Sequence, residues 1–272
     1  MKSLRRFRHG GGVRAVRRSP CDDESVRDER FSVVIPTLQR SRELWTLVEQ
    51  CAAHPLVGEV LVINNAPEPL SWESPKVRVL QQSRNIFVNP AWNLGAREAR
   101  YPFLAFVNDD VRFGDEVFDE CARVLRRGLF AMVGPDHPCF EPTEYSKPIS
   151  HRVAPEFNLV FGTFMCLRRE DYVPIPDKLR IWGGDDFLFW GQHRPNAVLV
   201  RTRFRTEMST TSSDPEFMAW RERERQATLA LLVDIQGARW WHRWGPVYSR
   251  MHRRGLALRG ALEALRIRRA RG

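Results

Sequence analysis

The first half of the chain alternates short apolar, β-branched runs with segments whose apolar residues recur at helical spacing. The runs predict four buried strands, at Phe31–Ile35, Glu59–Ile63, Val77–Leu80 and Phe103–Val107. The segments with apolar residues three or four positions apart predict three helices, at Arg42–Ala53, Pro90–Ala99 and Asp115–Arg126. Strands that alternate with helices are typical of a parallel α/β sheet, so the pattern predicts the α/β class.

The pattern loosens after Gly134. A proline-rich stretch, Pro135–Pro155, is a candidate substrate loop and precedes a further apolar run at Phe157–Leu167. Beyond it we expect a short helix at Asp186–Trp190, a strand at Ala197–Val200 and a long helix at Pro215–Ile235 with Asp214 as its N-cap.

Composition excludes several classes of protein. The chain has 272 residues, 43% hydrophobic and 28% charged, as in globular enzymes, and no apolar run approaches the roughly 18 to 20 residues that span a bilayer. Its five scattered cysteines contain no C-x-x-C pair, which argues against a disulfide framework and a zinc knuckle. The first 20 residues have no apolar core of a signal peptide, so we expect a cytoplasmic protein.

The net charge of +10 is concentrated at the two ends. Residues 1–30 carry nine basic and five acidic side chains, and residues 239–272 carry ten arginines against Glu263 alone. The body between them is mildly acidic, which argues against a folded basic face for nucleic acid. We therefore divide the chain into a disordered basic segment (1–30), a central folded domain (31–238) and a basic aromatic and helical extension (239–272).

Polar residues follow three of the predicted strands. Pro36 and Thr37 follow the first, Asn64 and Asn65 the second, and Asn108, Asp109 and Asp110 the fourth. Ligands of open α/β sheets bind beyond the carboxyl ends of the strands. Mg²⁺ and Mn²⁺ prefer carboxylate oxygens, so the two acids predict a divalent-cation site there, the alternative being a solvated turn or a helix N-cap.

A second acidic pair, Asp185 and Asp186, lies between Trp182-Gly183-Gly184 and an aromatic run. Aromatic neighbours remove water from a carboxyl group, which raises its pKa and suits it to act as a general base. The alternative is that one of these acids caps a short helix.

Six segments together resemble the family 2 glycosyltransferases of the GT-A fold. They are FSVVIPTLQR (31–40), VLVINNA (60–66), NIFVNPAWNLGAREA (85–99), FLAFVNDDV (103–111), FGTFMCLRREDY (161–172) and IWGGDDFLFW (181–190). The resemblance covers about residues 31–215 and implies a GT-A domain with a mostly parallel sheet, followed here by a helical extension.

The resemblance also implies a chemistry: transfer of a sugar, with inversion, from a nucleotide-sugar donor to an acceptor hydroxyl, with Mn²⁺ or Mg²⁺ on the diphosphate, in cell-surface glycan or glycoconjugate synthesis. Asp110 is then the main metal ligand assisted by Asp109, and Asp186 is the general base with Asp185 beside it. The implied nucleotide pocket consists of Pro36, Thr37, Asn64, Asn65, Asn85, Asn93, Asn108 and Asp109.

The sequence departs from the family pattern at two places. Asn64 and Asn65 stand where many relatives have an acid that contacts the nucleobase, which leaves the base open. Glu207 stands near the place of a metal-binding His and can supply oxygen to a cation, although it is equally an ordinary surface residue. Arg168 and Arg169 are candidates for donor phosphates or for ion pairs.

The C-terminal extension combines Trp240, Trp241, Trp244 and Tyr248 with eight arginines from Arg250 onward. This mixture predicts contact with the inner face of an anionic membrane, which a lipid-linked acceptor would explain, while a glycan or another hydroxyl acceptor stays open. The alternative is that the aromatics pack on the catalytic domain and the arginines are solvated. Two other functions stay open: a non-catalytic nucleotide-sugar-binding relative, and a nucleic-acid-binding protein that uses the arginine-rich ends. A nucleotidyltransferase would share the same sheet and acids.

Overall fold

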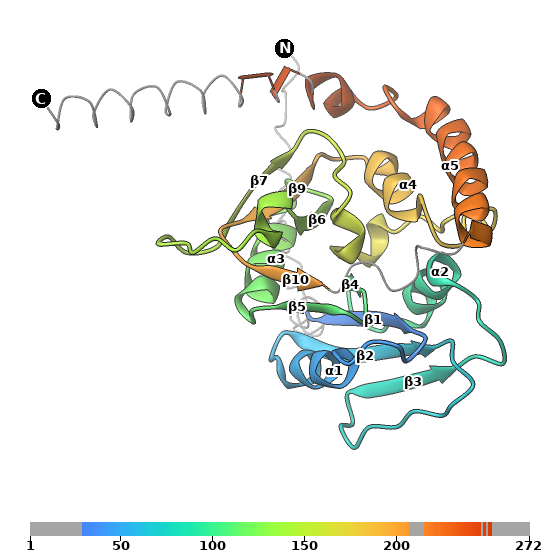
Figure 1. The fold of residues 1–272 in the computed structure, drawn as a ribbon. Helices are drawn as coiled ribbons and strands as arrows, with labels where there is room; N and C mark the ends of the chain where they lie inside the picture. Colours follow the sequence, from blue (N-terminus) through green and yellow to red (C-terminus); the bar gives the residue numbers. More distant parts are fainter. Residues whose placement is uncertain (1–28, 207–214, 246, 249, 252–272) are drawn as a thin grey trace, which may run out of the picture.

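The computed structural model describes residues 29–206, 215–245, 247–248 and 250–251, with the backbone alone for 215–219. An eight-stranded sheet in the order β3-β2-β1-β4-β8-β6-β9-β7 forms the centre of this part (Figure 1). Its strands are β1 (Phe31–Thr37), β2 (Val57–Asn64), β3 (Val77–Gln81), β4 (Phe103–Val107), β6 (Met132–Pro135), β7 (Ser150–Ala154), β8 (Phe164–Arg168) and β9 (Asn196–Val200). The α/β class is confirmed.

Strand direction changes three times across this sheet, between β4 and β8, between β8 and β6, and between β9 and β7. Strands β3, β2, β1 and β4 are all parallel, whereas β8 runs antiparallel to β4, pairing Val107 with Phe164 and Phe103 with Arg168. The start of β8 therefore lies beside the carboxyl end of β4. A separate antiparallel pair, β5 (Val111–Phe113) and β10 (Phe204–Thr206), follows directly from that end.

The helices lie close to their predicted positions. They are α1 (Leu44–Ala53), α2 (Val88–Glu98), α3 (Glu116–Arg127), α4 (Gly184–Gly191) and α5 (Pro215–Ile235), with single 3₁₀ turns η2 (His137–Phe140), η3 (Phe161–Thr163) and η4 (Arg169–Asp171). Helix α4 begins two residues before the predicted helix, and its N-cap is Gly183. The alternative that an aspartate caps this helix is therefore wrong, and Asp185 and Asp186 lie in its first turn. Asp214, the predicted cap of α5, is outside the described residues.

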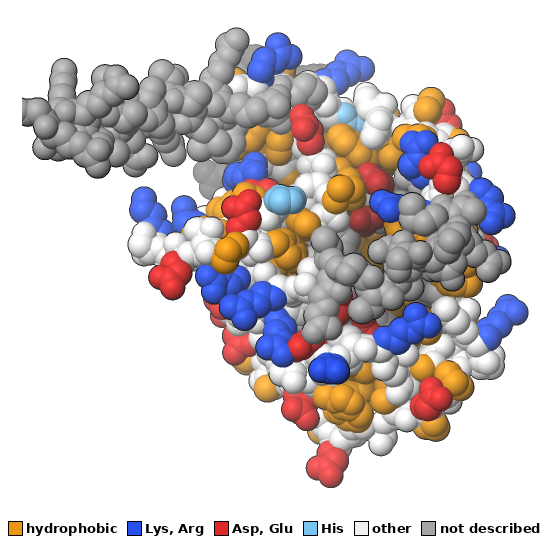
Figure 2. Space-filling view, in the orientation of Figure 1, with side chains coloured by type: hydrophobic (Ala, Val, Ile, Leu, Met, Phe, Trp, Pro, Cys, Tyr) orange, Lys and Arg blue, Asp and Glu red, His pale blue; other side chains and the backbone are white. Residues whose placement is uncertain are grey.

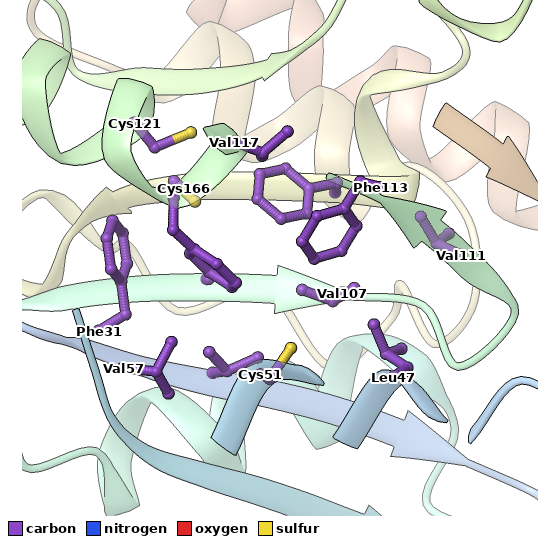
Figure 3. Close-up of a cluster of buried hydrophobic side chains, with 14 of the residues drawn as sticks. Phe31, Leu47, Cys51, Val57, Val107, Val111, Phe113, Val117, Cys121 and Cys166 are labelled. Carbon is purple, nitrogen blue, oxygen red and sulfur yellow. The ribbon is translucent and has the colours of Figure 1, made fainter. Parts of the chain in front are cut away.

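Alternate residues of the central strands enter two separate cores. Phe31, Val33 and Ile35 of β1 belong to the core that contains the buried residues of α1 and α3. Figure 3 shows Phe31 in this core, between Cys51 of α1 and Cys121 of α3. Val34, between them, faces the opposite core with α2 and α4. This is the period of two that a strand buried on both faces requires. Gly95 of α2 lies directly against the methyl groups of Val34, so the helix packs close to the strand.

Four cysteines lie in the described part of the chain, and each is buried and free of disulfide bonds. Burial raises the pKa of the Cys139 and Cys166 thiols, so these groups stay protonated at neutral pH. They act as small apolar core residues, as expected. Cys21 lies outside the described residues.

The structure describes only a small part of the two predicted terminal segments. Of residues 1–30 only Glu29 and Arg30 are described, and residues 252–272 are not. The described helices include none that is long and apolar enough to cross a membrane.

Candidate functional site

Asp109 and Asp110 occupy the turn between β4 and β5, at the carboxyl end of the central strand. Because β1 and β4 are parallel neighbours, their ends meet, and the Thr37 hydroxyl donates a 2.5 Å hydrogen bond to Asp109 Oδ2. Thr206, the last residue of β10, donates a 2.8 Å hydrogen bond to Asp110 Oδ2. Each acid therefore has one oxygen fixed by a hydroxyl group. The acids lie in a turn, but it is not the solvated turn of the alternative, because both are partly buried.

The surroundings of this acidic pair favour the binding of a cation. Burial raises the pKa of Asp109 to about 6, the Thr37 hydrogen bond opposes that rise, and the charge of Asp110 adds to it. Two adjacent carboxylates that are partly buried are stabilised by a divalent cation, for which one or two carboxylates together with substrate oxygens suffice. Asp109 and Asp110 fit such an ion through their oxygen donors. The described residues contain no cluster of three or more His, Cys, Asp or Glu side chains with metal-binding geometry.

The polar residues at the end of β2 organise the loop that follows. Asn64 accepts hydrogen bonds from Gln39 Nε2 and the Ala66 amide, and it donates to Glu68 O and Gln81 Oε1. The polar atoms of the Asn64 side chain therefore all bind other residues of the chain. The Asn65 side chain accepts a hydrogen bond from the Ile86 backbone amide at 3.1 Å, and the Asn65 backbone amide donates to Thr37 O at 2.8 Å. Asn65 thus joins Thr37 to the segment that leads into α2.

The remaining predicted nucleotide contacts divide into two groups. Pro36 is buried next to Thr37, and the Asn108 backbone amide donates to Thr163 O at 3.0 Å. Both residues therefore lie at the end of the sheet that carries Asp109. The exposed Asn85 accepts from the Phe87 amide. Asn93 is directed elsewhere: it accepts from the Tyr172 hydroxyl and the Ile175 amide and donates to Ile175 O. The structure does not bring Asn93 together with Thr37 and Asp109.

The second acidic pair lies next to the first through the short η3 turn. Asn108, which precedes Asp109, is bonded to Thr163 of this turn, and the neighbouring Gly162 packs directly against the Asp185 carboxylate. A side chain at position 162 would collide with that carboxylate. The contact shows why a residue without a side chain precedes Thr163, and it places both acidic pairs around one turn.

The two carboxyl groups of the second pair have different environments. Burial raises the pKa of Asp185, while hydrogen bonds from backbone amides of its own helix turn oppose the rise. Burial and the charge of Asp185 raise the pKa of Asp186 to about 7. Asp186 is therefore a carboxyl group whose pKa lies near neutral pH.

A buried acid of α5 holds the loop before this pair. The Glu224 carboxylate accepts hydrogen bonds from the backbone amides of Arg180, Ile181 and Trp182, at 3.0, 2.9 and 2.8 Å. From the other side, the Asn89 side chain of α2 donates to Trp182 O, and the Asn89 backbone amide donates to Arg180 O. Sequence reasoning missed Glu224 because it stands in a helix of alternating charges, RERERQ (221–226), where every acid has the pattern of an exposed residue.

The two glycines between this loop and the acids are required by their surroundings. Gly183 has φ +73°, a conformation that favours glycine, and a side chain there would meet Thr228 of α5. A side chain at Gly184 would meet the Asn89 amide group. The pair therefore lets α2 and α5 approach the loop from both sides.

Two further candidates are placed as follows. The hypothesis that Arg168 and Arg169 meet donor phosphates is wrong, because antiparallel β8 carries them to the opposite end of β4. There Arg168 pairs with Asp171, and Arg169 donates to Ala99 O. Glu207 lies outside the described residues, directly after Thr206.

We expect Glu224→Gln to loosen the loop at 180–182. The substitution removes the charge and presents an amide group to three backbone donors, which should lower the free energy of unfolding by about 1 to 3 kcal/mol. Hydrogen exchange of the Arg180, Ile181 and Trp182 amides should become faster by about tenfold or more. Mass spectrometry of the peptide that contains them measures this.

Glu222→Gln is the matched control, because Glu222 is two residues away in α5, is exposed and pairs with Arg225. It should leave exchange at 180–182 unchanged. Equal exchange in the Glu224→Gln protein and the wild type would show that this carboxylate does not hold the loop.

Solved structures share this architecture at low sequence identity. A crystal structure of GalNAc-T7 with UDP, GalNAc and Mn²⁺ is 13% identical, with a TM-score of 0.53 over 72% of this chain and 48% of that one. S. aureus TarS 1–349 in complex with UDP-GlcNAc is 17% identical, with a TM-score of 0.50 over 70% of this chain and 64% of that one. The chain thus spans about half of the first protein and less than two thirds of the second. A comparison with curated proteins gives no match.

The family assignment rests on the sequence of the described domain itself. Residues 32–224 match the model of glycosyl transferase family 2, a range that begins in β1 and ends at Glu224. It contains both acidic pairs and the loop between α2 and α5. The fold is that of the GT-A glycosyltransferases, and the chain belongs to glycosyl transferase family 2.

Proposed function

We propose that the chain transfers a sugar from a nucleoside-diphosphate donor to an acceptor hydroxyl, with inversion at the anomeric carbon and with the help of Mn²⁺ or Mg²⁺. The observation that carries the proposal is the meeting of two acidic pairs around the η3 turn, one suited to a cation and the other containing a carboxyl group with a pKa of about 7. The likeness to structures that contain UDP and UDP-GlcNAc supports a uridine-diphosphate sugar as the first donor to test.

In this proposal Asp110 and Asp109 hold the ion, and Glu207 is a candidate third ligand. The ion, when bound, neutralises negative charge that develops on the leaving diphosphate. The Thr37 and Thr206 hydroxyls keep the two carboxylates in place. We further propose that Pro36, Thr37, Asn65, Asn85 and Asn108 line the nucleotide pocket, and that Asn64 acts indirectly by ordering the loop after β2.

Asp186 takes the proton of the acceptor hydroxyl as its oxygen attacks the anomeric carbon and the bond to the diphosphate breaks. A base works best when its pKa lies near the working pH, and the pKa of Asp186 meets this condition. Asp185 assists by raising that pKa and by packing on Gly162. Glu224 positions both acids through the loop at 180–182. Action in the cytoplasm stays a prediction from the sequence.

We expect Asp186→Asn to lower kcat by about 10² to 10⁴, with little change in donor KM. The wild-type rate should fall below about pH 7 because the base becomes protonated there. Release of nucleoside diphosphate from a panel of nucleotide sugars, with and without simple acceptor sugars, measures both effects. If Asp185→Asn proves the more damaging substitution, the base is assigned to the wrong member of the pair.

The raised pKa of Asp186 can be tested without any substrate. The folded protein holds this proton more tightly than the unfolded chain, whose carboxyl has the ordinary pKa of 3.8. The free energy of unfolding should therefore decrease as the pH rises from about 4 to 7. Asp186→Asn should consequently gain about 1 to 3 kcal/mol relative to the wild type at pH 8 and almost nothing near pH 3.5.

Urea unfolding at several pH values measures this difference, with Asp234→Asn as control because Asp234 is exposed on α5. The control should keep the wild-type pH dependence. A constant difference between Asp186→Asn and the wild type across the range would contradict the raised pKa.

We expect Asp110→Ala to abolish nearly all turnover while the protein stays folded, because the substitution removes a charge that holds the ion. The wild type should lose activity with a chelator and regain it with Mn²⁺ or Mg²⁺. Asp119→Ala, an exposed acid of α3, is the matched control and should keep activity. Equal turnover with and without chelator would refute the metal dependence, and nucleotide-sugar binding with no turnover would favour the non-catalytic relative.

A further inference from the structure

A short final helix follows α5 and carries the tryptophan-rich segment. The chain turns after Ile235, with Gly237 at φ +85°, and becomes helical again at Trp240. Of the residues described there, 240–245, 247–248 and 250–251 are helical. In Figure 1 this helix lies at the top of the molecule, beyond α4 and away from β1, β2 and β3.

One side of the final helix is fixed to the catalytic domain. Trp241 is buried, donates from Nε1 to Gln192 O at 3.1 Å and stacks on Trp190 of α4 with an interplanar angle of 2°. His242 packs edge-on against Trp190, and Gly245 lies directly against the backbone of Pro155. These contacts fix which side of the helix points outward.

The outward side is apolar. Trp240, Trp244, Val247 and Met251 follow one another at intervals of four, three and four residues, which places them on one face of the helix. Their exposed fractions are 63%, 63%, 40% and 69%. We name these four residues the terminal face. The alternative that the aromatics of this segment pack on the domain therefore holds for Trp241 but not for Trp240 or Trp244.

Basic residues border the terminal face. Arg243 and Arg250 are exposed and, at helical spacing, lie together on one flank of it, with Arg239 just before the helix. The sequence after Met251 adds seven further arginines and a single acid, Glu263. On the face drawn in Figure 2, Lys and Arg side chains also gather elsewhere, including one group left of the centre, so basic charge alone does not distinguish the terminal face.

We propose that the terminal face binds the surface of an anionic lipid bilayer. Tryptophan prefers the boundary between acyl chains and headgroups, and arginine reaches from that depth to lipid phosphates. An amphipathic helix with an aromatic apolar face and a basic flank lies in this interface. Trp240 and Trp244 could also stack on the bases of a single-stranded nucleic acid, but Val247 and Met251, which complete the terminal face, have no such role, whereas all four suit an acyl-chain boundary.

Sedimentation of the full chain with lipid vesicles tests the proposal. The protein should pellet with phosphatidylcholine vesicles that contain phosphatidylglycerol at low salt, and less at high salt because salt screens the charges. Vesicles of phosphatidylcholine alone should bind it less. Trp240→Ser/Trp244→Ser should weaken binding to the anionic vesicles by about tenfold or more, since the two largest apolar groups of the terminal face are removed.

Leu229→Ser/Val233→Ser is the matched control, because both residues are exposed apolar side chains of α5 outside the terminal face. It should bind vesicles as the wild type does. Circular dichroism of both double variants checks that they stay folded. Because the assay measures binding and not turnover, its result is independent of the proposed transferase activity.

Three outcomes would overturn the proposal: absence of the wild type from the pellet at low salt, equal vesicle binding by the Trp240→Ser/Trp244→Ser protein, or a dimer in light scattering that only this variant loses. The last outcome would identify the terminal face as a contact between copies of the chain. Tight binding of an oligonucleotide that the variant retains, with no vesicle binding, would assign the arginines to nucleic acid.

Discussion

The change of strand direction between β4 and β8 is the constraint on which the site depends. Because β8 runs against β4, its first residue pairs with Val107, the last residue of β4. The η3 turn that enters β8 is thereby fixed beside Asn108 and Asp109, and Gly162 in that turn contacts Asp185. In a fully parallel sheet the chain would enter the next strand at the opposite edge, far from these acids. The reversal thus joins two acidic pairs that are about 75 residues apart in sequence.

The fold and the acidic pairs could be predicted from the sequence because both are encoded locally. Apolar runs gave the strands, and their carboxyl ends identified Thr37, Asp109 and Asp110 as neighbours, which the Thr37–Asp109 hydrogen bond confirms. The direction of β8 could not be predicted, since an apolar run has the same appearance in either direction, and the error with Arg168 and Arg169 followed from it. Likewise, an asparagine that orders a loop cannot be told in the sequence from one that faces a ligand. The hydrogen bonds of Asn64 and Asn93 within the chain could therefore be identified only in the structure.

The two acidic pairs show how neighbouring groups give the same residue type different properties. Asp109 and Asp110 are each fixed by a threonine hydroxyl, from β1 and β10 respectively, which leaves oxygens in defined directions. Asp185 is bound by amides of its own helix, whereas Asp186 lies beside a charged neighbour and gains no comparable stabilisation. The loop before them is held by Glu224 and Asn89, so helices α2 and α5 set the position of the pair. Hydrogen bonds thus fix the position of the first pair, whereas burial and a neighbouring charge set the pKa of Asp186 in the second.

Helix α4 is only eight residues long, with the second acidic pair in its first turn and Trp190 near its other end. Asp186 and Trp190 are four residues apart in it, a rise of about 6 Å, and Trp190 stacks on the buried side of the final helix. One turn of α4 therefore connects the acidic pair to the side of the final helix that packs on the domain. A displacement of the final helix that moves Trp190 would reach Asp186 through this single turn, without passing through the central sheet.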